Sequence, residues 1–198
     1  MGVSVDDIKK LRELTGVGLT DAKKALVEAE GDFDKALEAM RKKGLTKAEK
    51  KGDREAREGL IEGYVHSGRI GVIVEVNCET DFVARLDDFK TLAHEVAMQI
   101  AAMSPKYVSE ADIPAEEMER VKAELMASES LASKPEEMRE KIVEGQLKKH
   151  FAEQVLMSQA YILDDSKTVE QYVKEAIAKL GENIVIRQFK RIELGVSE

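Results

Sequence analysis

The sequence lacks most of the residues on which disulfide-linked, metal-binding and membrane-spanning proteins depend. Its 198 residues include a single cysteine, Cys78, so no internal disulfide can form. This cysteine and the three histidines, His66, His94 and His150, are too scattered to match the spacing of a zinc site. The longest stretches without a charged residue run about ten residues, whereas a membrane helix needs about 20. We therefore expect no cofactor, no structural metal and no membrane span.

Signals for export are also missing, and proline is scarce. The first ten residues include Asp6, Asp7, Lys9 and Lys10 and have no apolar run, which disfavours both a signal peptide and a transit peptide. Only three prolines occur, while 43% of the residues are hydrophobic and 35% are charged. This balance is typical of a folded, helix-rich protein rather than a disordered one. We expect a folded cytoplasmic protein.

The net charge of −8 is spread unevenly along the chain. Residues 1–44 carry 9 basic and 9 acidic groups, residues 45–57 carry 5 and 3, and the remainder carries 17 and 27. An acidic body repels phosphate backbones, so direct binding to nucleic acid is disfavoured. An RNA-binding arm at residues 41–57 is an alternative, but that segment has no aromatic residue on which a base could stack. A protein partner fits the composition better.

Residues 1–44 have the pattern of three short amphipathic helices joined by short connections. The expected N-terminal caps are Ser4, Thr20 and Asp32, and the expected ends are Gly16, Gly31 and Gly44. Helices of this length are not stable alone, so they are expected to pack into a compact bundle. The apolar pattern then fades, and residues 45–57 are predicted to be a charged linker that is partly helical.

Residues 58–198 are predicted to form an α+β core. Alternating apolar residues indicate a β-hairpin over residues 60–66 and 69–78, with its turn at Ser67 and Gly68. Helical patterns follow over residues 89–103, after Pro114, after Pro135 and from Thr168, whose capping box is completed by Gln171. Residues 183–194 are predicted to be a last strand, and the change of apolar phase between Ile186 and Phe189 indicates either a bulge or burial on both faces. The hairpin and this strand would form a small antiparallel sheet packed by helices.

The residue patterns point away from an enzyme. The glycines of residues 15–18 resemble part of a phosphate loop, but such a loop follows a strand and continues into Gly-Lys-Ser/Thr, whereas these glycines end a helix. None of the three histidines lies in a recognisable motif with a Ser or Cys nucleophile. Composition and pattern alone leave a two-part interaction protein, for example an adapter or scaffold with a helical docking module.

Two segments resemble a known family. The stretch LRELTGVGLTDAKKAL at residues 11–26 resembles the opening motif of the elongation factor Ts family, and NCETDFVA at residues 77–84 is similar to its central signature. Residues 142–149 and 181–187 are also family-like, so the likeness covers nearly the whole chain in order. The resemblance implies a translation factor of protein biosynthesis that acts as guanine nucleotide exchange factor for elongation factor Tu.

The resemblance also implies the site residues. In the family, a ubiquitin-associated-like module, here residues 1–44, docks on the GTP-binding domain of elongation factor Tu, and a Thr-Asp-Phe-Val motif intrudes beside its Mg²⁺ site. The implied docking residues are Arg12, Leu19 and Thr20, and the implied intruding residues are Thr80, Asp81, Phe82 and Val83. Many members have two methionines at the positions of Leu19 and Thr20, so Thr20 lacks an apolar side chain and is expected to serve mainly as a helix cap. The competing interpretation of Phe82 is ordinary core packing after a buried strand.

The resemblance to short-form members implies a homodimer. Longer members have two related core halves, and short members pair to complete that architecture. A three-stranded sheet with apolar alternation needs its outer face covered, and twofold pairing of identical sheets would cover it. We expect residues 183–194 at or near this interface.

Overall fold

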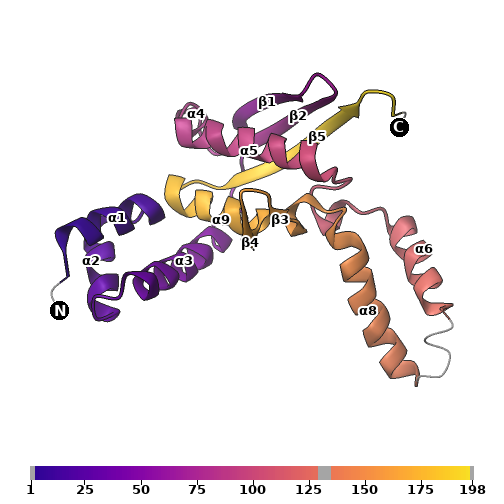
Figure 1. The fold of residues 1–198 in the computed structure, drawn as a ribbon, viewed down its shortest axis with the longest axis horizontal. Helices are drawn as coiled ribbons and strands as arrows, with labels where there is room; N and C mark the ends of the chain where they lie inside the picture. The colour runs from indigo at the N-terminus through magenta and orange to yellow at the C-terminus, as the bar shows by residue number, and fades with distance from the viewer. Residues whose placement is uncertain (1–2, 129–134, 197–198) are drawn as a thin grey trace.

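The computed structural model describes residues 3–128 and 135–196. It is a mixed α+β structure, as predicted, with three N-terminal helices followed by a core that contains a small antiparallel sheet (Figure 1). The elements are α1 (Val5–Thr15), α2 (Leu19–Glu28), α3 (Phe33–Glu49), β1 (Glu58–His66), β2 (Ile70–Cys78), α4 (Asp81–Ala84), α5 (Asp87–Met103), η1 (Glu110–Asp112), α6 (Ala115–Met126), α8 (Glu136–Ala152), η2 (Leu156–Ser158), β3 (Ala160–Tyr161), β4 (Asp164–Thr168), α9 (Val169–Leu180) and β5 (Ile184–Glu193).

The first three helices form the predicted bundle. Ser4 accepts a hydrogen bond from the backbone N–H of Asp7 at 3.1 Å, and Asp32 accepts one from Lys35 at 3.1 Å, so both caps are confirmed. Gly16 ends α1 in the left-handed conformation, with φ 64°. The bundle has its own apolar core, made of the buried residues Leu11, Ala22, Ala25, Leu26, Ala36 and Met40.

Three predicted helix ends are wrong. Thr20 does not cap α2, because the extended conformation of Gly18 starts the helix at Leu19 and places Thr20 inside the first turn. The same helix ends at Glu28, before Gly31. Gly44 does not end α3, which continues to Glu49. Gly44 is buried against α9, where an added Cβ would lie 3.2 Å from the Cβ of Ala178, so this glycine permits close packing of two helices.

The three-stranded sheet has the order β1-β2-β5 and is antiparallel throughout. Ser67 and Gly68 turn the hairpin with φ 51° and 67°, the positive values that a two-residue turn requires. The predicted bulge in the last strand is confirmed: Ile186 pairs with Val76 and Gln188 with Glu75, which leaves Arg187 as the extra residue. Its guanidinium donates to the side chain of Asn77 and to the carbonyl of Ala56, at 3.1 and 3.2 Å.

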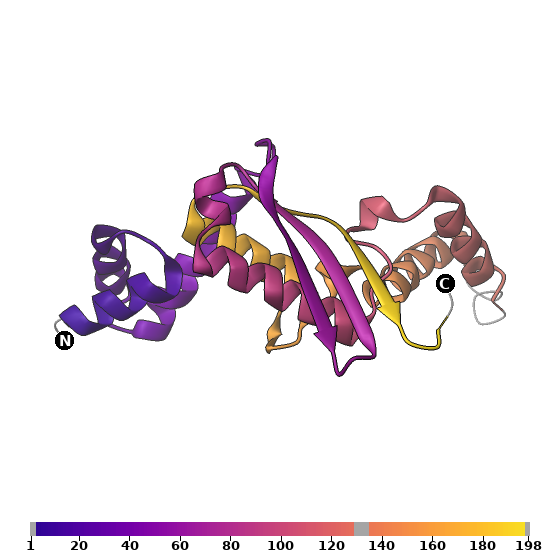
Figure 2. The ribbon, with the colours of Figure 1, turned by 90° about the horizontal axis from the view of Figure 1, so that it is seen from above.

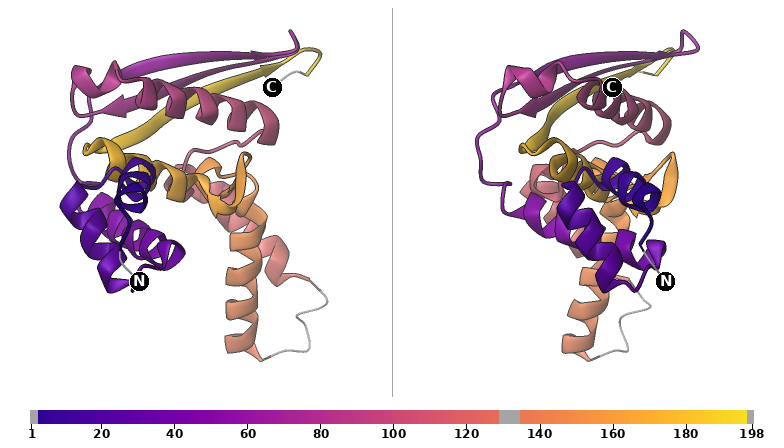
Figure 3. Two further views of the ribbon diagram at one scale, coloured as in Figure 1. Left: turned by 60° about the vertical axis from the view of Figure 1, so that its left-hand side comes forward. Right: turned by 90° about the vertical axis from the view of Figure 1, so that its left-hand side faces the viewer.

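One face of the sheet is covered by α5, and α9 lies beyond it (Figures 2 and 3). Phe89, Leu92, Val96 and Ile100 of α5 are buried in one cluster with the inward residues of β2, which are Val72, Val74 and Val76. The opposite face carries apolar side chains that are exposed: Ile61, Val65, Ile73 and Ile192 are each 59% to 71% exposed. Within the described residues nothing covers this face.

Helices α6 and α8 form a hairpin that projects away from the sheet (Figure 1). Pro114 and Pro135 immediately precede the two helices, as predicted, and Thr168 with Gln171 forms the predicted capping box of α9. The contact between α6 and α8 has a separate small core that contains Val121 and Phe151. In the described parts of the chain, no helix is both long and apolar enough to cross a membrane.

Candidate functional site

The Thr-Asp-Phe-Val motif lies at the end of the sheet, where β2 passes into the one-turn helix α4. Thr80 precedes the helix in an extended conformation, with φ −130° and ψ 154°. Val83 turns inward and is 7% exposed, whereas Phe82 turns outward and is 77% exposed. Exposure of a whole aromatic ring is unusual for a residue beside a buried strand. The structure therefore places Phe82 outside the core and Val83 within it.

The start of α4 is held by a carboxylate from the far end of the chain. Glu182 accepts hydrogen bonds from the backbone N–H groups of Glu79 and Thr80, at 3.1 and 3.0 Å, through Oε2. Its Oε1 accepts a third from the Thr80 hydroxyl, at 2.7 Å. Thr80 occupies the capping position of α4, but its hydroxyl donates to Glu182 instead of closing the turn of the helix.

The contact between the two segments runs in both directions, because Glu79 also binds the segment that contains Glu182. Glu79 Oε1 accepts a hydrogen bond from the backbone N–H of Asn183 at 2.7 Å and forms an ion pair with Arg54 at 3.5 Å. The two acidic side chains therefore each bind the backbone of the other's segment, one from the end of β2 and one from the turn between α9 and β5. This double contact joins residues about a hundred positions apart in sequence.

Cys78 supports the same turn from inside the core. It is fully buried, and its thiol donates to the carbonyl of Thr80 at 3.1 Å. Burial raises the pKa of this thiol to about 11, and the negative charge of Glu182 adds to the rise. A thiol held so far toward its protonated form is a poor nucleophile, so Cys78 is a structural residue here.

The segment that enters β1 is tied to the same turn. The Asn183 side chain, 2% exposed, donates to the carbonyls of Gly52 and Arg54 at 3.2 and 2.7 Å. Lys51 Nζ donates to the carbonyl of Gly181, at the C-terminal end of α9, at 2.5 Å. Residues 181–183, which we call the anchor turn, therefore contact both the linker from the first three helices and the motif.

Asp81 is engaged within its own helix. Its carboxylate pairs with Arg85 Nη2 at 2.8 Å, and both side chains are substantially exposed, at 47% and 78%. Such a surface pair has little net stability. Asp81 can therefore leave Arg85 for another cation at small cost.

The predicted docking residues lie in the first three helices, apart from the motif. Arg12 is near the end of α1, and Leu19 and Thr20 open α2; all three are exposed. Leu19 is 52% exposed and Leu14 is 56% exposed, so each of the two helices carries an exposed apolar side chain near the corner that joins them. Figure 1 shows α1 and α2 toward the same side of the molecule as α4.

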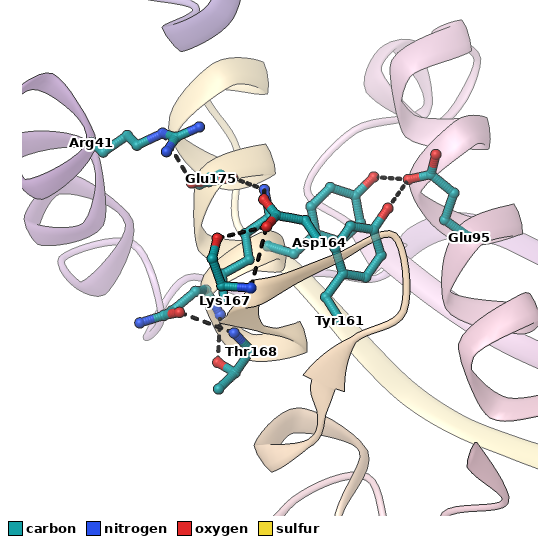
Figure 4. Close-up of polar contacts among 10 residues, drawn as sticks. Arg41, Glu95, Tyr161, Asp164, Lys167, Thr168 and Glu175 are labelled. Carbon is teal, nitrogen blue, oxygen red and sulfur yellow. Dashed lines mark hydrogen bonds and ion pairs between the residues drawn. The ribbon is translucent and has the colours of Figure 1, made fainter. Parts of the chain in front are cut away.

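Polar contacts join the first three helices to the core (Figure 4). Glu175 of α9 pairs with Arg41 of α3 at 3.6 Å and with Lys167 of β4 at 2.7 Å. The stacked rings of Tyr161 and Tyr172 lie beside Lys167 and border a pocket of about 380 Å³.

Both tyrosine hydroxyls donate to Glu95 of α5. Burial and the neighbouring Glu95 carboxylate raise the pKa of each tyrosine above its usual value, so both phenols stay neutral. The junction therefore combines ion pairs with the close packing of α3 against α9 at Gly44.

Sequence reasoning missed three features of this region. The sequence shows Glu182 and Asn183 only as part of a family-like stretch, because their hydrogen bonds reach residues distant in sequence and follow no local pattern. The short β3-β4 hairpin was also missed, since strands of two and five residues are too short for a periodic signal. No cluster of three or more potential metal-ligating side chains occurs within residues 3–128 and 135–196.

Comparison with known proteins matches this chain to a family model and to proteins that carry the same name. A family model described as "Elongation factor TS" matches residues 45–196. Elongation factor Ts from Thermotoga neapolitana is 55% identical over 196 residues, which cover 98% of this chain and 98% of that protein. The Thermotoga maritima protein of the same name is 54% identical over the same shares. Elongation factor Ts from Thermoanaerobacter sp. strain X514 is 52% identical over 194 residues, covering 98% of this chain and 95% of that protein.

Proposed function

The chain belongs to the elongation factor Ts family of translation elongation factors, and on that premise we propose that it is the guanine nucleotide exchange factor of elongation factor Tu. It would bind the GDP-bound and the nucleotide-free partner in the cytoplasm and promote GDP release by disturbing the Mg²⁺ and phosphate site. No covalent bond is made or broken in this reaction, so the protein is not an enzyme. Neither nucleic acid nor a membrane takes part.

The observation that carries the proposal is the exposure of Phe82 on an anchored one-turn helix. Moving one phenylalanine from water into an apolar contact is worth roughly 1.5–3 kcal/mol. To promote exchange, a contact between this protein and elongation factor Tu must be stronger when GDP is absent. This is because a factor that weakens GDP binding must itself bind more weakly, by the same ratio, when GDP is present. Since about 1.4 kcal/mol corresponds to a tenfold change, Phe82 can account for one or two decades of GDP weakening.

Displacement of Mg²⁺ would supply the remainder. A bound divalent cation is often the largest local charge in a nucleotide site, and its loss leaves the phosphates without their counter-charge. Asp81 is suitably placed to disturb the metal's environment, because it lies beside Phe82 and its pairing with Arg85 is weak. Thr80 and Val83 would fix the motif from either side, through Glu182 and through the core.

The first module would provide affinity that does not depend on nucleotide. We assign residues 1–44 to a ubiquitin-associated-like docking module, residues 45–57 to the linker and residues 58–198 to the core and dimerisation domain. The separate apolar core of the first three helices and the exposure of Leu19 and Arg12 support this division. Thr20 would contribute through its position at the same corner.

The exposed face of the sheet favours a homodimer. The register aligns Val65 with Gly71 and Ile192 across the three strands, and Gly63 with Ile73 and Lys190. A second copy of the same sheet can cover these apolar side chains about a twofold axis. Residues 183–194, which include the strand β5, would then lie at the interface.

The test is release of a fluorescent GDP from purified elongation factor Tu, followed by stopped flow across a titration of this protein. Acceleration that saturates with factor concentration is expected. An adapter or scaffold of the alternative class would bind elongation factor Tu without changing the release rate. Binding measured in parallel without any acceleration would therefore overturn the exchange function.

A further inference from the structure

We infer that Glu182 is a positioning residue for nucleotide exchange: its carboxylate fixes the start of α4 and thereby the direction in which Phe82 projects. The inference rests on the proposed function. It adds to the Thr-Asp-Phe-Val motif a residue from the other end of the chain that acts through the motif rather than on the nucleotide.

The first step is that α4 cannot hold its own orientation. The helix has four residues, far below the length at which an isolated helix is stable. It forms a single turn, which begins with the hydrogen bond from the N–H of Ala84 to the carbonyl of Thr80 at 3.3 Å. The direction of Phe82 must therefore come from contacts outside the helix.

The second step is that these contacts act from two sides. Val83 anchors the inner side in the main apolar cluster. Glu182 anchors the entry to the helix through its three hydrogen bonds to Glu79 and Thr80, all between 2.7 and 3.1 Å. Hydrogen bonds to an ionised carboxylate are stronger than neutral ones. Without them, the backbone N–H groups of Glu79 and Thr80 would lose their acceptor, and only the bond from the Cys78 thiol to the Thr80 carbonyl and the packing of Val83 would hold the segment.

The third step is that Glu182 is itself firmly placed. Gly181 ends α9 in the left-handed conformation, with φ 85°, and so aims the chain back toward β2. Asn183 is buried and makes hydrogen bonds through both its side chain and its backbone N–H. The carboxylate is therefore held between a helix end and a strand start, which is a rigid base for a positioning group.

The experiment compares Glu182→Ala, Phe82→Ala and the double variant in full-length protein, by stopped-flow release of fluorescent GDP from elongation factor Tu. Glu182→Ala is expected to lower the saturating release rate about three- to tenfold, less than Phe82→Ala. If Glu182 acts through Phe82, the double variant should be within about twofold of Phe82→Ala alone, because the direction of a ring that has been removed no longer matters and the two effects are not additive. A residue that only supports the fold would slow release by a further independent factor.

Two further variants complete the test. Glu182→Gln should recover most of the rate, because a glutamine can accept from both N–H groups and donate to the Thr80 hydroxyl. Glu170→Ala removes a glutamate of the first turn of α9 that pairs with Lys174, and its saturating release rate should match that of the parent. If Glu182→Ala does not fold by circular dichroism, Glu182→Asp is measured in its place against the same thresholds.

The outcomes are distinguishable. An unchanged rate for folded Glu182→Ala, or a double variant slower by the product of the two single effects, overturns the positioning role while the exchange function stands. A parent protein that does not accelerate GDP release at all overturns the proposed function, and the positioning role with it.

Discussion

Phe82 and Val83 are neighbours with opposite environments, one exposed to solvent and one buried. We predict that Phe82→Ala keeps the fold, binds elongation factor Tu only modestly more weakly and slows factor-stimulated GDP release about ten- to a hundredfold, the share that one buried aromatic ring can carry. Stopped-flow release at saturating factor measures the effect, with circular dichroism as the folding control. A folded variant as fast as the parent would assign Phe82 no part in exchange.

Cys78 makes stability depend on pH in a defined direction. Burial raises the pKa of its thiol from 9.0 to about 11, so the folded state holds the proton more tightly than the unfolded state. The resulting contribution to stability is complete below pH 9 and is lost as the pH rises from 9 to 11. The pKa values of Tyr161 and Tyr172 are also raised above their usual value of 10.0, so these two groups add to the loss of stability from about pH 10 upward.

The test compares the parent with Cys78→Ala. The variant lacks the titrating thiol, so the difference in melting temperature between the two should narrow between pH 8 and pH 10. Thermal unfolding followed by circular dichroism at these two pH values measures it. A difference that stays constant would show that the thiol does not titrate with unfolding.

At the scale of elements, the anchor turn connects more segments than its length suggests. Asn183 donates to two backbone carbonyls of the linker and is nearly inaccessible to water. Replacement by alanine would leave those carbonyls without their donors, at about 1–3 kcal/mol. We predict that Asn183→Ala lowers the free energy of unfolding by about 2 kcal/mol in urea titrations. Glu38→Ala, which removes an exposed pair with Lys42 on α3, is the control and should change it by less than about 0.5 kcal/mol.

Local patterns predicted those elements whose ends are determined locally. The caps at Ser4, Asp32 and Thr168 and the turn at Ser67 depend on residues within a few positions, and each is confirmed. The bulge in β5 was also visible, because it shifts the apolar alternation within the strand itself.

Distant contacts account for what the sequence could not show. Gly44 looks like a helix end, yet its role is set by Ala178 on another helix. Glu182 contacts Thr80 across 102 residues, and a lone glutamate after a helix has no pattern that reveals such a contact. The resemblance indicated the motif residues, whose part in exchange stays a prediction, whereas the residues that orient them required the structure.

At the scale of the whole molecule, we expect the first three helices and the core to contribute differently to the binding of elongation factor Tu. A chain beginning at Arg54 should stay folded, because the main apolar cluster draws almost entirely on later residues. It should bind elongation factor Tu much more weakly, because Arg12 and Leu19 are absent. Isothermal titration calorimetry measures the affinity, and circular dichroism the fold. Undiminished affinity would show that the first module is dispensable.

The uncovered sheet face leads to a prediction of mass. The chain has a mass of 22.0 kDa, so a homodimer should scatter light as a particle of about twice that mass at micromolar concentration. Ile73→Glu places a charge at the centre of the apolar face and should yield monomers of parental secondary structure. Glu124→Ala, on the distant helix α6, serves as the control and should leave the mass unchanged. A parent of 22.0 kDa would contradict the dimer.

Because of the bulge at Arg187, the effect of deleting one residue from β5 depends on which residue is deleted. Because Arg187 is the unpaired extra residue, loss of its codon alone would leave Ile186 and Phe189 facing inward and would join them through Gln188 in regular alternation. Loss of the codon for Phe189 would instead turn every later residue of the strand to the opposite face. Arg187 is thus the one position in β5 whose retention the pairing pattern does not require. Its hydrogen bonds to Asn77 and Ala56 give a reason for natural selection to keep it.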